Sequence, residues 1–401
     1  MPAGSHSTER ERSPAARGSR WYAGVAVSVA ALIALVAVFI GQSTGNSSPI
    51  GGSGEPTPTG SSDGSGTAAS GPDVTTPAGY LIIDGPQLAA LPTSGPEWES
   101  MLSVATESLG TPDLADQDST VAGQTVAAAL VYARTGDDAY RDRVITVLTE
   151  AEQAPLAYAR VLSVARQLAG FVIAADLVDY RDDSFESWVD DMRTQTFGGH
   201  SRWFQITQTS ENSANNWGSW ALASRIAASA YLGDTKDLDR ASQVFRGLMG
   251  ESDAYAGFQP TEDFDPSWAC DPENWVPVNP AGCGELSGAP VEDVSRSGGS
   301  APTIDSTGVT YAWEFLGGAT LSARVLAHSG YPSVYAWGDQ ALLRAGRFLA
   351  DNGGYPAPDS VNQYIPWEID SAYDVSLGPV NAAGFGRQFG FTDWLSASPP
   401  T

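Results

Sequence analysis

Apolar residues recur every three or four positions through most of the chain beyond residue 120, the spacing of helices with one buried face. This pattern predicts helices over residues 121–133, 155–178, 218–232, 238–249, 314–329 and 337–350. Their apolar faces are rich in alanine, which has the highest helix propensity. Runs of alternating apolar and polar residues are short and few, so the expected fold class is all-α.

Three stretches repeat the order of helix, glycine-containing turn and helix: residues 129–148, 228–248 and 323–349. One helical hairpin cannot bury its own apolar face, so repeated hairpins predict either a solenoid or an incomplete barrel of antiparallel helix pairs, an (α/α) toroid. The repeats are too irregular for a tetratricopeptide array. The long aromatic-rich loops over residues 251–310 are expected to form a cleft on this scaffold.

The N-terminal part of the chain has a different pattern. Residues 22–40 are uncharged and almost wholly apolar, about the length that crosses a bilayer core as a helix. Arginines precede this run, and Trp21 and Tyr22 lie at its edge; the positive-inside rule then places the N-terminus in the cytoplasm. We expect a basic cytoplasmic tail over residues 1–21 and an uncleaved signal anchor over residues 22–41. A cleaved signal peptide is the alternative.

Residues 42–77 consist largely of Gly, Ser, Thr and Pro. A segment of this composition cannot bury enough apolar surface to fold and is expected to be a flexible linker. The folded domain is therefore expected over residues 78–401, outside the cytoplasm, in a single-pass protein of the cell membrane.

The two cysteines, Cys270 and Cys283, lie in a loop rich in Pro and Asn. In an oxidising compartment they are expected to form a disulfide, which the loop-entropy model values at about 3 kcal/mol. A pair of free thiols is the alternative.

Charge narrows the functions to be considered. The chain has 21 Lys and Arg against 47 Asp and Glu, a net charge of −26, so nucleic acid is an unexpected partner. Lysine occurs only as Lys236, and there are 3 histidines. A nucleophilic lysine and an all-histidine metal site are therefore not expected.

Tryptophans suggest a carbohydrate cleft. Of the 12 tryptophans, all except Trp21 lie beyond residue 77, several of them beside Asn, Asp or Glu. Aromatic rings with polar neighbours suit the C–H faces and hydroxyl rims of sugars; packing in the core is the alternative for each. The candidate substrate-binding residues are Trp203, Trp217, Trp268, Trp275, Trp313 and Glu314.

Two further segments suggest a chemical step. Asn215 and Asn216 directly precede an alanine-rich helix, where they can cap the helix or, with the helix-terminal N–H groups, bind a developing enolate oxygen. Arg296 lies in a glycine-rich loop, and Tyr311 lies at an expected helix start. A nearby cation favours the phenolate form of a tyrosine, although Tyr311 can also be a packing residue.

Together, NSANNWGSWALASRIAASAYLGD, SRSGG, TYAWEFLGGATLSARVL, YPSVYAWGDQALLRAGRFLADNGGYP and GFTDWL resemble bacterial proteins of the alginate-lyase-like group, polysaccharide lyases with an (α/α) toroid. The resemblance covers most of residues 120–395. It implies β-elimination on a polysaccharide that contains uronic acid, with no cofactor.

The family motif implies roles for individual residues. Asn215 and Asn216 match its asparagines, but Trp217 stands where the family has histidine. The resemblance implies that Asn216 and Arg296 neutralise the uronate carboxylate and that Tyr311 transfers the C5 proton to O4. Arg296 and Tyr311 lie further apart than expected, and His200 is a candidate to replace the missing imidazole.

Two alternatives remain open at this stage. An α/α scaffold can also carry a glycoside hydrolase with paired carboxylates, for which Glu262, Asp263, Asp265 and Glu314 are candidates; the acidity of the chain favours it, since a polyanion would be repelled. The missing histidine favours a non-catalytic glycan-binding protein of the cell envelope. A polyuronate enzyme would need its few arginines gathered in the cleft.

Overall fold

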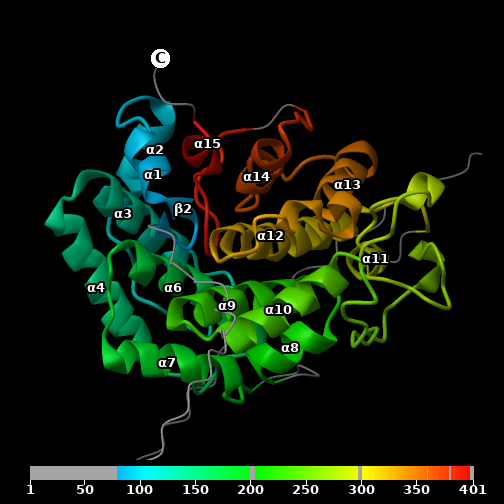
Figure 1. Ribbon diagram of the computed structural model, residues 1–401, viewed down its shortest axis with the longest axis horizontal. Coiled ribbons are helices and arrows are strands. Elements are labelled where there is room, and N and C mark those ends of the chain that lie inside the picture. Colours follow the sequence, from blue (N-terminus) through cyan, green and yellow to red (C-terminus); the bar gives the residue numbers. More distant parts are fainter. Residues whose placement is uncertain (1–78, 199–203, 297–299, 359, 379–380, 398–401) are drawn as a thin grey trace, which may run out of the picture. The chain divides into compact units, whose positions relative to one another are not determined.

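The computed structural model describes residues 79–198, 204–296, 300–358, 360–378 and 381–397, and this part of the chain is mostly helical (Figure 1). The expected all-α class is confirmed. Two short strands, β1 (Gly79–Tyr80) and β2 (Ile83–Asp84), form an antiparallel hairpin. Every described residue belongs to the compact unit Pro72–Thr401.

The helices have the following bounds. They are α1 (Gly85–Ala90), α2 (Pro96–Thr106), α3 (Val121–Thr135), α4 (Asp138–Glu152), α5 (Val161–Ala165), α6 (Leu168–Leu177), α7 (Asp183–Thr194), α8 (Ile206–Asn212), α9 (Asn216–Leu232), α10 (Thr235–Leu248), α11 (Val291–Ser295), α12 (Ser306–His328), α13 (Trp337–Asn352), α14 (Tyr364–Tyr373) and α15 (Thr392–Leu395). Short 3₁₀ turns are η1 (Pro266–Trp268), η2 (Gly284–Leu286) and η3 (Val334–Ala336). The three expected helical hairpins are α3–α4, α9–α10 and α12–α13.

One expected helix is divided. Residues 155–178 were predicted as one helix, but the structure has α5 and α6, with residues 155–160 outside both. The division is stabilised by Ser224 of α9, whose hydroxyl donates to Ala165 O (2.9 Å) and accepts from Ala169 N (3.1 Å). Because a side chain of another helix satisfies these backbone groups, Arg166 and Gln167 can leave the helical path between them.

Helix α12 begins earlier than predicted. Asp305 caps it by accepting hydrogen bonds from the N–H groups of Thr307 and Gly308, so the helix starts at Ser306 rather than at residue 314. Tyr311 and Glu314 therefore lie within the helix, one turn apart on neighbouring positions of its surface, and not at its start.

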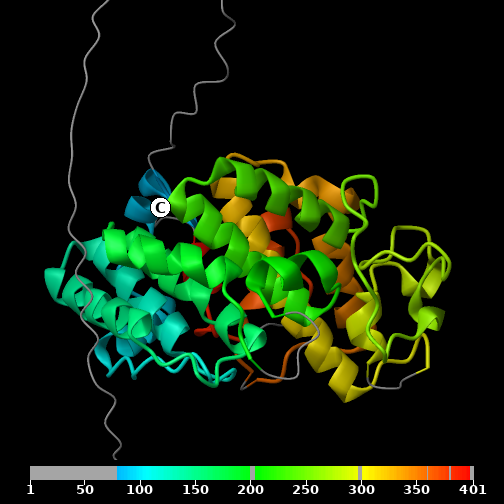
Figure 2. The ribbon, with the colours of Figure 1, turned by 90° about the horizontal axis from the view of Figure 1, so that it is seen from below.

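Helices α9 and α12 form the centre of the core and pack along each other (Figures 1 and 2). Two glycines of α12 allow this close approach: a Cβ atom at Gly317 would lie 2.7 Å from the ring of Trp220, and one at Gly318 would lie 2.3 Å from Ser219 Oγ. Ser219 Oγ in turn donates to Phe315 O. The start of α9 is thus fixed against the middle of α12.

The contacts between helices follow a closed order. From α3 they run through α6, α9, α12 and α14 to α15, and α15 contacts α2, which packs on α3. The rings of Trp98 in α2 and Trp394 in α15 have centroids 5.6 Å apart. Gly123 N also donates to Arg387 O (2.9 Å), which brings the segment before α15 beside α3.

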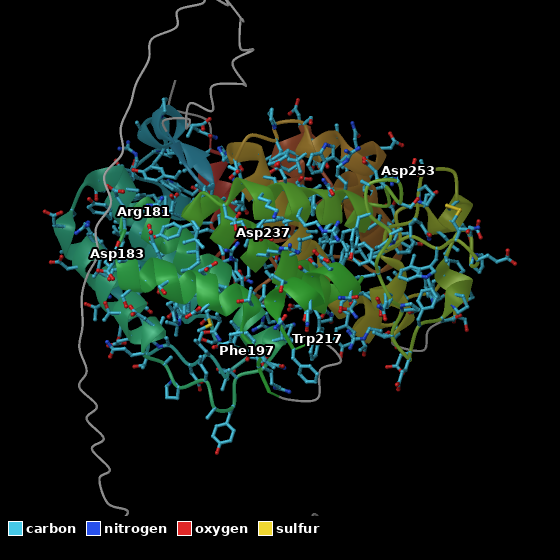
Figure 3. All side chains as sticks on the ribbon, turned by 60° about the horizontal axis from the view of Figure 1, so that its bottom comes forward. Arg181, Asp183, Phe197, Trp217, Asp237 and Asp253 are labelled. Atoms are coloured by element: carbon cyan, nitrogen blue, oxygen red, sulfur yellow. A yellow bond between two sulfur atoms is a disulfide. The ribbon has the colours of Figure 1, made fainter. Side chains whose placement is uncertain are left out.

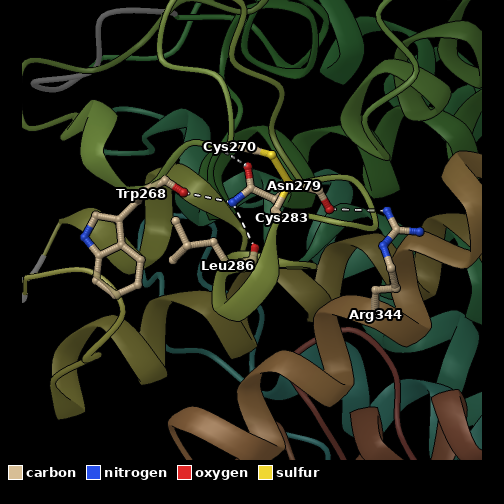
Figure 4. Close-up of a disulfide and its surroundings, with 6 residues drawn as sticks. All are labelled: Trp268, Cys270, Asn279, Cys283, Leu286 and Arg344. Carbon is tan, nitrogen blue, oxygen red and sulfur yellow. Dashed lines mark hydrogen bonds between the residues drawn. A yellow bond between two sulfur atoms is a disulfide. The ribbon is translucent and has the colours of Figure 1, made fainter.

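The expected disulfide is confirmed: Cys270 is bonded to Cys283 (Figure 4). Asn279 organises the loop between them, since its Oδ1 accepts from Cys270 N (3.0 Å) and its Nδ2 donates to Trp268 O (2.8 Å) and Leu286 O (3.0 Å). Arg344 of α13 donates to Asn279 O (3.3 Å). The loop is therefore fixed both within itself and to a helix.

The expected anchor over residues 22–41, the tail before it and the linker over residues 42–77 lie outside the described residues. Within the part that is described, no helix combines the length and the apolarity needed to cross a membrane.

Candidate active site

Four side chains form a buried corner between the start of α9 and α11, which we call the amide corner: Asn215, Asn216, Glu292 and Asp293. Asn215 caps α9, since its Oδ1 accepts from Trp217 N (3.0 Å). Its Nδ2 donates to Glu292 Oε1 (3.3 Å), and Asn216 Nδ2 donates to Asp293 Oδ1 (3.0 Å). Asn215 Oδ1 caps the helix, whereas the Nδ2 atoms of Asn215 and Asn216 contact the acids. Capping therefore does not prevent the amides from having a role in the site.

The two acids of the amide corner are removed from solvent, with exposed fractions of 0%. Burial raises the pKa of both carboxyl groups, that of Asp293 well above its usual range, and Arg296 only partly opposes the shift. A buried carboxyl group with a raised pKa retains its proton at higher pH than usual. It can therefore hold an amide without adding a full negative charge to the site.

Arg296 and Tyr311 continue the same set of contacts. Arg296 is the C-cap residue of α11, and its Nη1 lies 3.9 Å from Asp293 Oδ1. The Cζ atom of its guanidinium lies 4.5 Å from the ring centroid of Tyr311 in α12, a cation–π distance. The structure thus brings Asn216, Arg296 and Tyr311 together through Asp293, although they come from three different helices or helix ends.

A second group, which we call the arginine cluster, consists of Arg166, Arg387 and Glu314. Glu314 Oε2 accepts from Arg166 Nη2 (2.9 Å), and Glu314 Oε1 lies 3.6 Å from Arg387 Nη2. Trp220 Nε1 (3.0 Å) and Asn362 Nδ2 (3.2 Å) also donate to this carboxylate. Every oxygen of Glu314 is therefore occupied by protein donors.

The contacts of the arginine cluster determine the charge states of Glu314 and Arg166. Burial alone would raise the pKa of Glu314, but Arg166, Arg387 and the two hydrogen bonds hold it below its usual value. Burial lowers the pKa of Arg166, which Glu314 and, less strongly, Tyr311 oppose. Glu314 is thus an ionised structural anion with no proton to donate at neutral pH, and the arginine cluster lies close enough to Tyr311 for their charges to interact.

Two of the proposed sugar-binding tryptophans lie in the core. Trp268 is 0% exposed and Trp313 is 1% exposed, and Trp313 Nε1 donates to Gly354 O (3.0 Å). The described structure therefore offers neither ring to a sugar. Glu314, the remaining substrate-binding candidate of this helix, is buried against arginines as described above.

The other tryptophans differ in position. Trp217 is half-buried in the first turn of α9 (Figure 3). Trp275 is half-buried, packs on Phe264 with ring centroids 4.8 Å apart, and lines a small cavity of ≈ 160 Å³ together with Tyr255 and Phe258. His200 and Trp203 lie outside the described residues. Trp217, beside the amide corner, is the predicted tryptophan nearest to the site in sequence and contacts.

Sequence reasoning missed several residues of this region. Arg166 and Arg387 were hidden, the first inside an apparently continuous helix and the second in a glycine-rich segment. The exposed rings of Tyr158 (86%) and Phe204 (40%) are also new; they lie on neighbouring loops, since Arg160 pairs with Gly198 and Phe197 N donates to Phe204 O. In the sequence, the signal was an aromatic residue two positions from an arginine, as with Tyr158 and Arg160.

No group of three or more Asp, Glu, His or Cys side chains gathers as a metal site within the residues described. The arrangement instead combines buried amide donors, arginines and one tyrosine hydroxyl. These groups can stabilise a negative charge that develops on a bound molecule and can transfer a proton.

Comparison with known proteins agrees with this chemistry. Residues 114–263 match the family model described as alginate lyase, a segment that contains Arg166 and the amides of α9. No curated protein matches the chain. The match confirms, over these residues, the resemblance to the alginate-lyase-like group, and it supports a polysaccharide lyase, a carbon–oxygen lyase.

Proposed function

We propose that the protein is a membrane-anchored, extracytoplasmic lyase that cleaves a uronic-acid-containing polysaccharide by β-elimination. The observation that carries the proposal is the set of contacts from Asn216 through Asp293 and Arg296 to Tyr311. It joins an amide donor, a cation and a phenol in one place. The alginate lyase match over residues 114–263 is consistent with this chemistry.

The first chemical requirement is stabilisation of an enolate-like intermediate. The proton at C5 of a uronate becomes removable when the adjacent carboxylate is neutralised, because negative charge then moves onto the carboxylate oxygens. Asn216 and Arg296 supply an N–H donor and a positive charge for this step. Asp293 acts through both of them and is a positioning residue.

The second requirement is proton transfer. In the proposed mechanism the Tyr311 oxygen takes the C5 proton, the bond between C4 and the O4 leaving group breaks, and a C4–C5 double bond forms. Tyr311 then returns a proton to O4, so the enzyme ends the cycle in its starting protonation state. The ring of Tyr311 lies against the Arg296 guanidinium, which places the phenol beside the cation that is proposed to neutralise the carboxylate.

The missing family histidine does not prevent this mechanism. Trp217 occupies its place in the sequence, but Arg166 and Arg387 pair with Glu314, which lies three residues after Tyr311 in α12, and they add positive charge to this region. His200 remains a prediction, since it lies outside the described residues. The pairing of Arg166 and Arg387 around Glu314 supports the expectation that a polyuronate enzyme gathers arginines in an otherwise acidic chain.

The finer fold and location belong to the same proposal. The closed order of helix contacts supports an (α/α) toroid, and the apolar run over residues 22–40 supports the anchor. The contacts of Glu314 speak against the paired-carboxylate hydrolase alternative, because a carboxylate held ionised between two arginines is a poor general acid.

The test is product formation from a panel of polysaccharides. The full-length protein in detergent is incubated with alginate, hyaluronan, chondroitin and neutral glucans, and the ultraviolet absorbance of unsaturated uronate is followed. We expect absorbance to rise with at least one uronate polymer and with no neutral glucan. Reducing sugar without unsaturation would indicate the hydrolase instead, and no product with any polymer would contradict both enzymes.

A further inference from the structure

The loop before α3 places one exposed carboxylate over the arginine cluster. The side chain of Asp118 is 66% exposed, and its Oδ1 lies 3.2 Å from Arg387 Nη2 and 3.8 Å from Arg166 Nη1. The two arginine side chains are only 13% and 8% exposed. Asp118 is therefore the member of this group that solvent reaches most easily.

The loop itself is held firmly to the helices below it. Gln167 Nε2 donates to Asp113 O and Asp116 O (both 2.9 Å). Arg166 Nη1 donates to Gln117 O (3.4 Å), and Arg160 Nη2 donates to Gln117 Oε1 (3.3 Å). The position of Asp118 beside the arginines is thus set by its loop and does not depend on its own ion pairs.

The two carboxylates of the group differ in what they contribute. Glu314 is buried, accepts three hydrogen bonds from protein donors and forms an ion pair with Arg387, and it cannot exchange these partners for a ligand at low cost. Asp118 makes exposed ion pairs, which contribute little to stability because solvent screens them. The Nε atoms of Arg166 and Arg387 are buried and have no hydrogen-bond partner among the described residues. The ion pairs of Asp118 are therefore the contacts of the two arginines that a ligand carboxylate could replace at the lowest cost.

We propose that Asp118 covers an anion-binding face of the Arg166–Arg387 pair and competes there with an anionic group of the polysaccharide. The inference rests on the proposed function, since it assumes that the sugar bound at Tyr311 also reaches the neighbouring arginines. Binding then exchanges one carboxylate for another, and Asp118 lowers the affinity for polyanions without taking part in the chemical step. It is a specificity-determining residue that weakens binding to acidic chains.

The decisive variant is Asp118→Asn, which keeps the shape of the side chain and removes its charge. We expect the KM for the cleaved polyuronate, and the Kd measured by calorimetry for alginate, to fall by up to about fivefold, the range for an exposed ion pair. The kcat should not change, because Asp118 does not touch the reacting atoms. The gain should shrink as salt is raised.

Matched controls separate competition from a structural role. Asp116→Asn removes the same charge from the same loop and keeps an oxygen for Asp118 N; it should leave KM and Kd nearly unchanged. Asp118→Glu keeps the charge and should resemble the wild type. Melting temperatures of all variants show whether the loop is still folded.

Several results would overturn the proposal. If Asp118→Asn weakens binding or leaves it unchanged, Asp118 orients Arg387 or has no role at the site. An equal rise in affinity for neutral dextran and for alginate would show that the charge of Asp118 does not control binding. If no polyanion binds to the wild type or to the variant, the two arginines do not form an anion-binding face. If no unsaturated product forms but the variant still binds alginate more tightly, the proposed lyase fails while the anion-binding face remains.

Discussion

The amide corner and the arginine cluster handle buried carboxyl groups in opposite ways. In the amide corner, burial dominates, and the pKa values of Glu292 and Asp293 are raised. In the arginine cluster, two guanidinium groups outweigh burial, and the pKa of Glu314 is lowered. A buried carboxyl group thus keeps its proton to higher pH than usual in the amide corner and stays ionised to lower pH than usual in the arginine cluster.

This difference has a functional meaning. Polar groups that orient a donor toward an anionic substrate work best when they add no negative charge, which the raised pKa of Asp293 provides. Arginines that would otherwise repel one another in a buried place need a fixed anion between them, which Glu314 provides. A site for a polyanion can therefore contain several acidic residues without repelling its substrate.

The largest expected effect is on catalysis and comes from Tyr311. Tyr311→Phe removes the hydroxyl that the proposed mechanism uses for proton transfer but keeps the ring under Arg296. We expect kcat to fall by about 10²–10⁴-fold with little change in melting temperature. Tyr158→Phe removes the hydroxyl of an exposed ring and should keep its activity. Full activity in Tyr311→Phe would remove the tyrosine from the mechanism.

The next largest expected effect is on stability and comes from removing the buried carboxylate of Glu314. Glu314→Ala leaves Arg166 and Arg387 together in a buried place without their counter-ion, and we expect the free energy of unfolding to fall by about 3–5 kcal/mol. Chemical denaturation measures it. Glu262→Ala, the same change at an exposed carboxylate, should have almost no effect. Equal losses in the two variants would show that Glu314 is not a structural anion.

A somewhat smaller effect is expected from Asn216, the amide that the proposed mechanism assigns to the enolate. Asn216→Ala removes one hydrogen-bond donor to the developing charge and should lower kcat by about 10²–10³-fold. Asn212→Ala changes an asparagine of α8 whose Nδ2 donates to Gln208 O; it should keep most of its activity. A large rise in KM at constant kcat would instead assign Asn216 to ground-state binding.

The last variant, Asp293→Asn, keeps an acceptor for Asn216 and is expected to change the pH dependence of stability. Because the pKa of Asp293 is raised in the folded protein, folding binds a proton at pH values between the unfolded and the folded pKa. Stability from this group is full below its usual pKa of 3.8 and is lost as pH rises through the folded pKa. Asp293→Asn should remove this decline.

The stability that Glu314 contributes depends on pH in the opposite direction. Its folded pKa is lowered, so its contribution is present above its usual pKa of 4.5 and is lost as pH falls through the folded pKa. Denaturation curves measured from acid to alkaline pH separate the two groups. If Asp293→Asn and Glu314→Gln changed the pH dependence in the same direction, the assigned charge states would be wrong.

Much of the helical scaffold could be predicted because its information is local. The three hairpins follow from apolar spacing and from turn glycines such as Gly136 and Gly233, which adopt positive φ at the ends of α3 and α9. The disulfide follows from the presence of only two cysteines in one loop. The position of Asn215 at a helix start follows from its capping preference.

The rest of the site could not be predicted from the sequence, because it depends on contacts between segments that lie far apart in the chain. Arg166 leaves the helical path because Ser224 satisfies the backbone around it, and no local pattern reveals this partner. Arg387 reaches the site because its backbone pairs with Gly123. Trp268 and Trp313 have polar neighbours in sequence yet are buried by the packing of the fold, so sequence context alone could not separate core rings from exposed ones.

The central claim is that Asn216 and Tyr311 act on the same reacting group, and a double-mutant cycle tests it most directly. The rates of Asn216→Ala, Tyr311→Phe and the double variant are compared with the wild type by the ultraviolet absorbance of unsaturated uronate. Residues that act as one unit are strongly non-additive. We predict that the double variant is about as slow as the slower single variant. A rate reduced by the product of the two single effects would show independent residues and contradict the account.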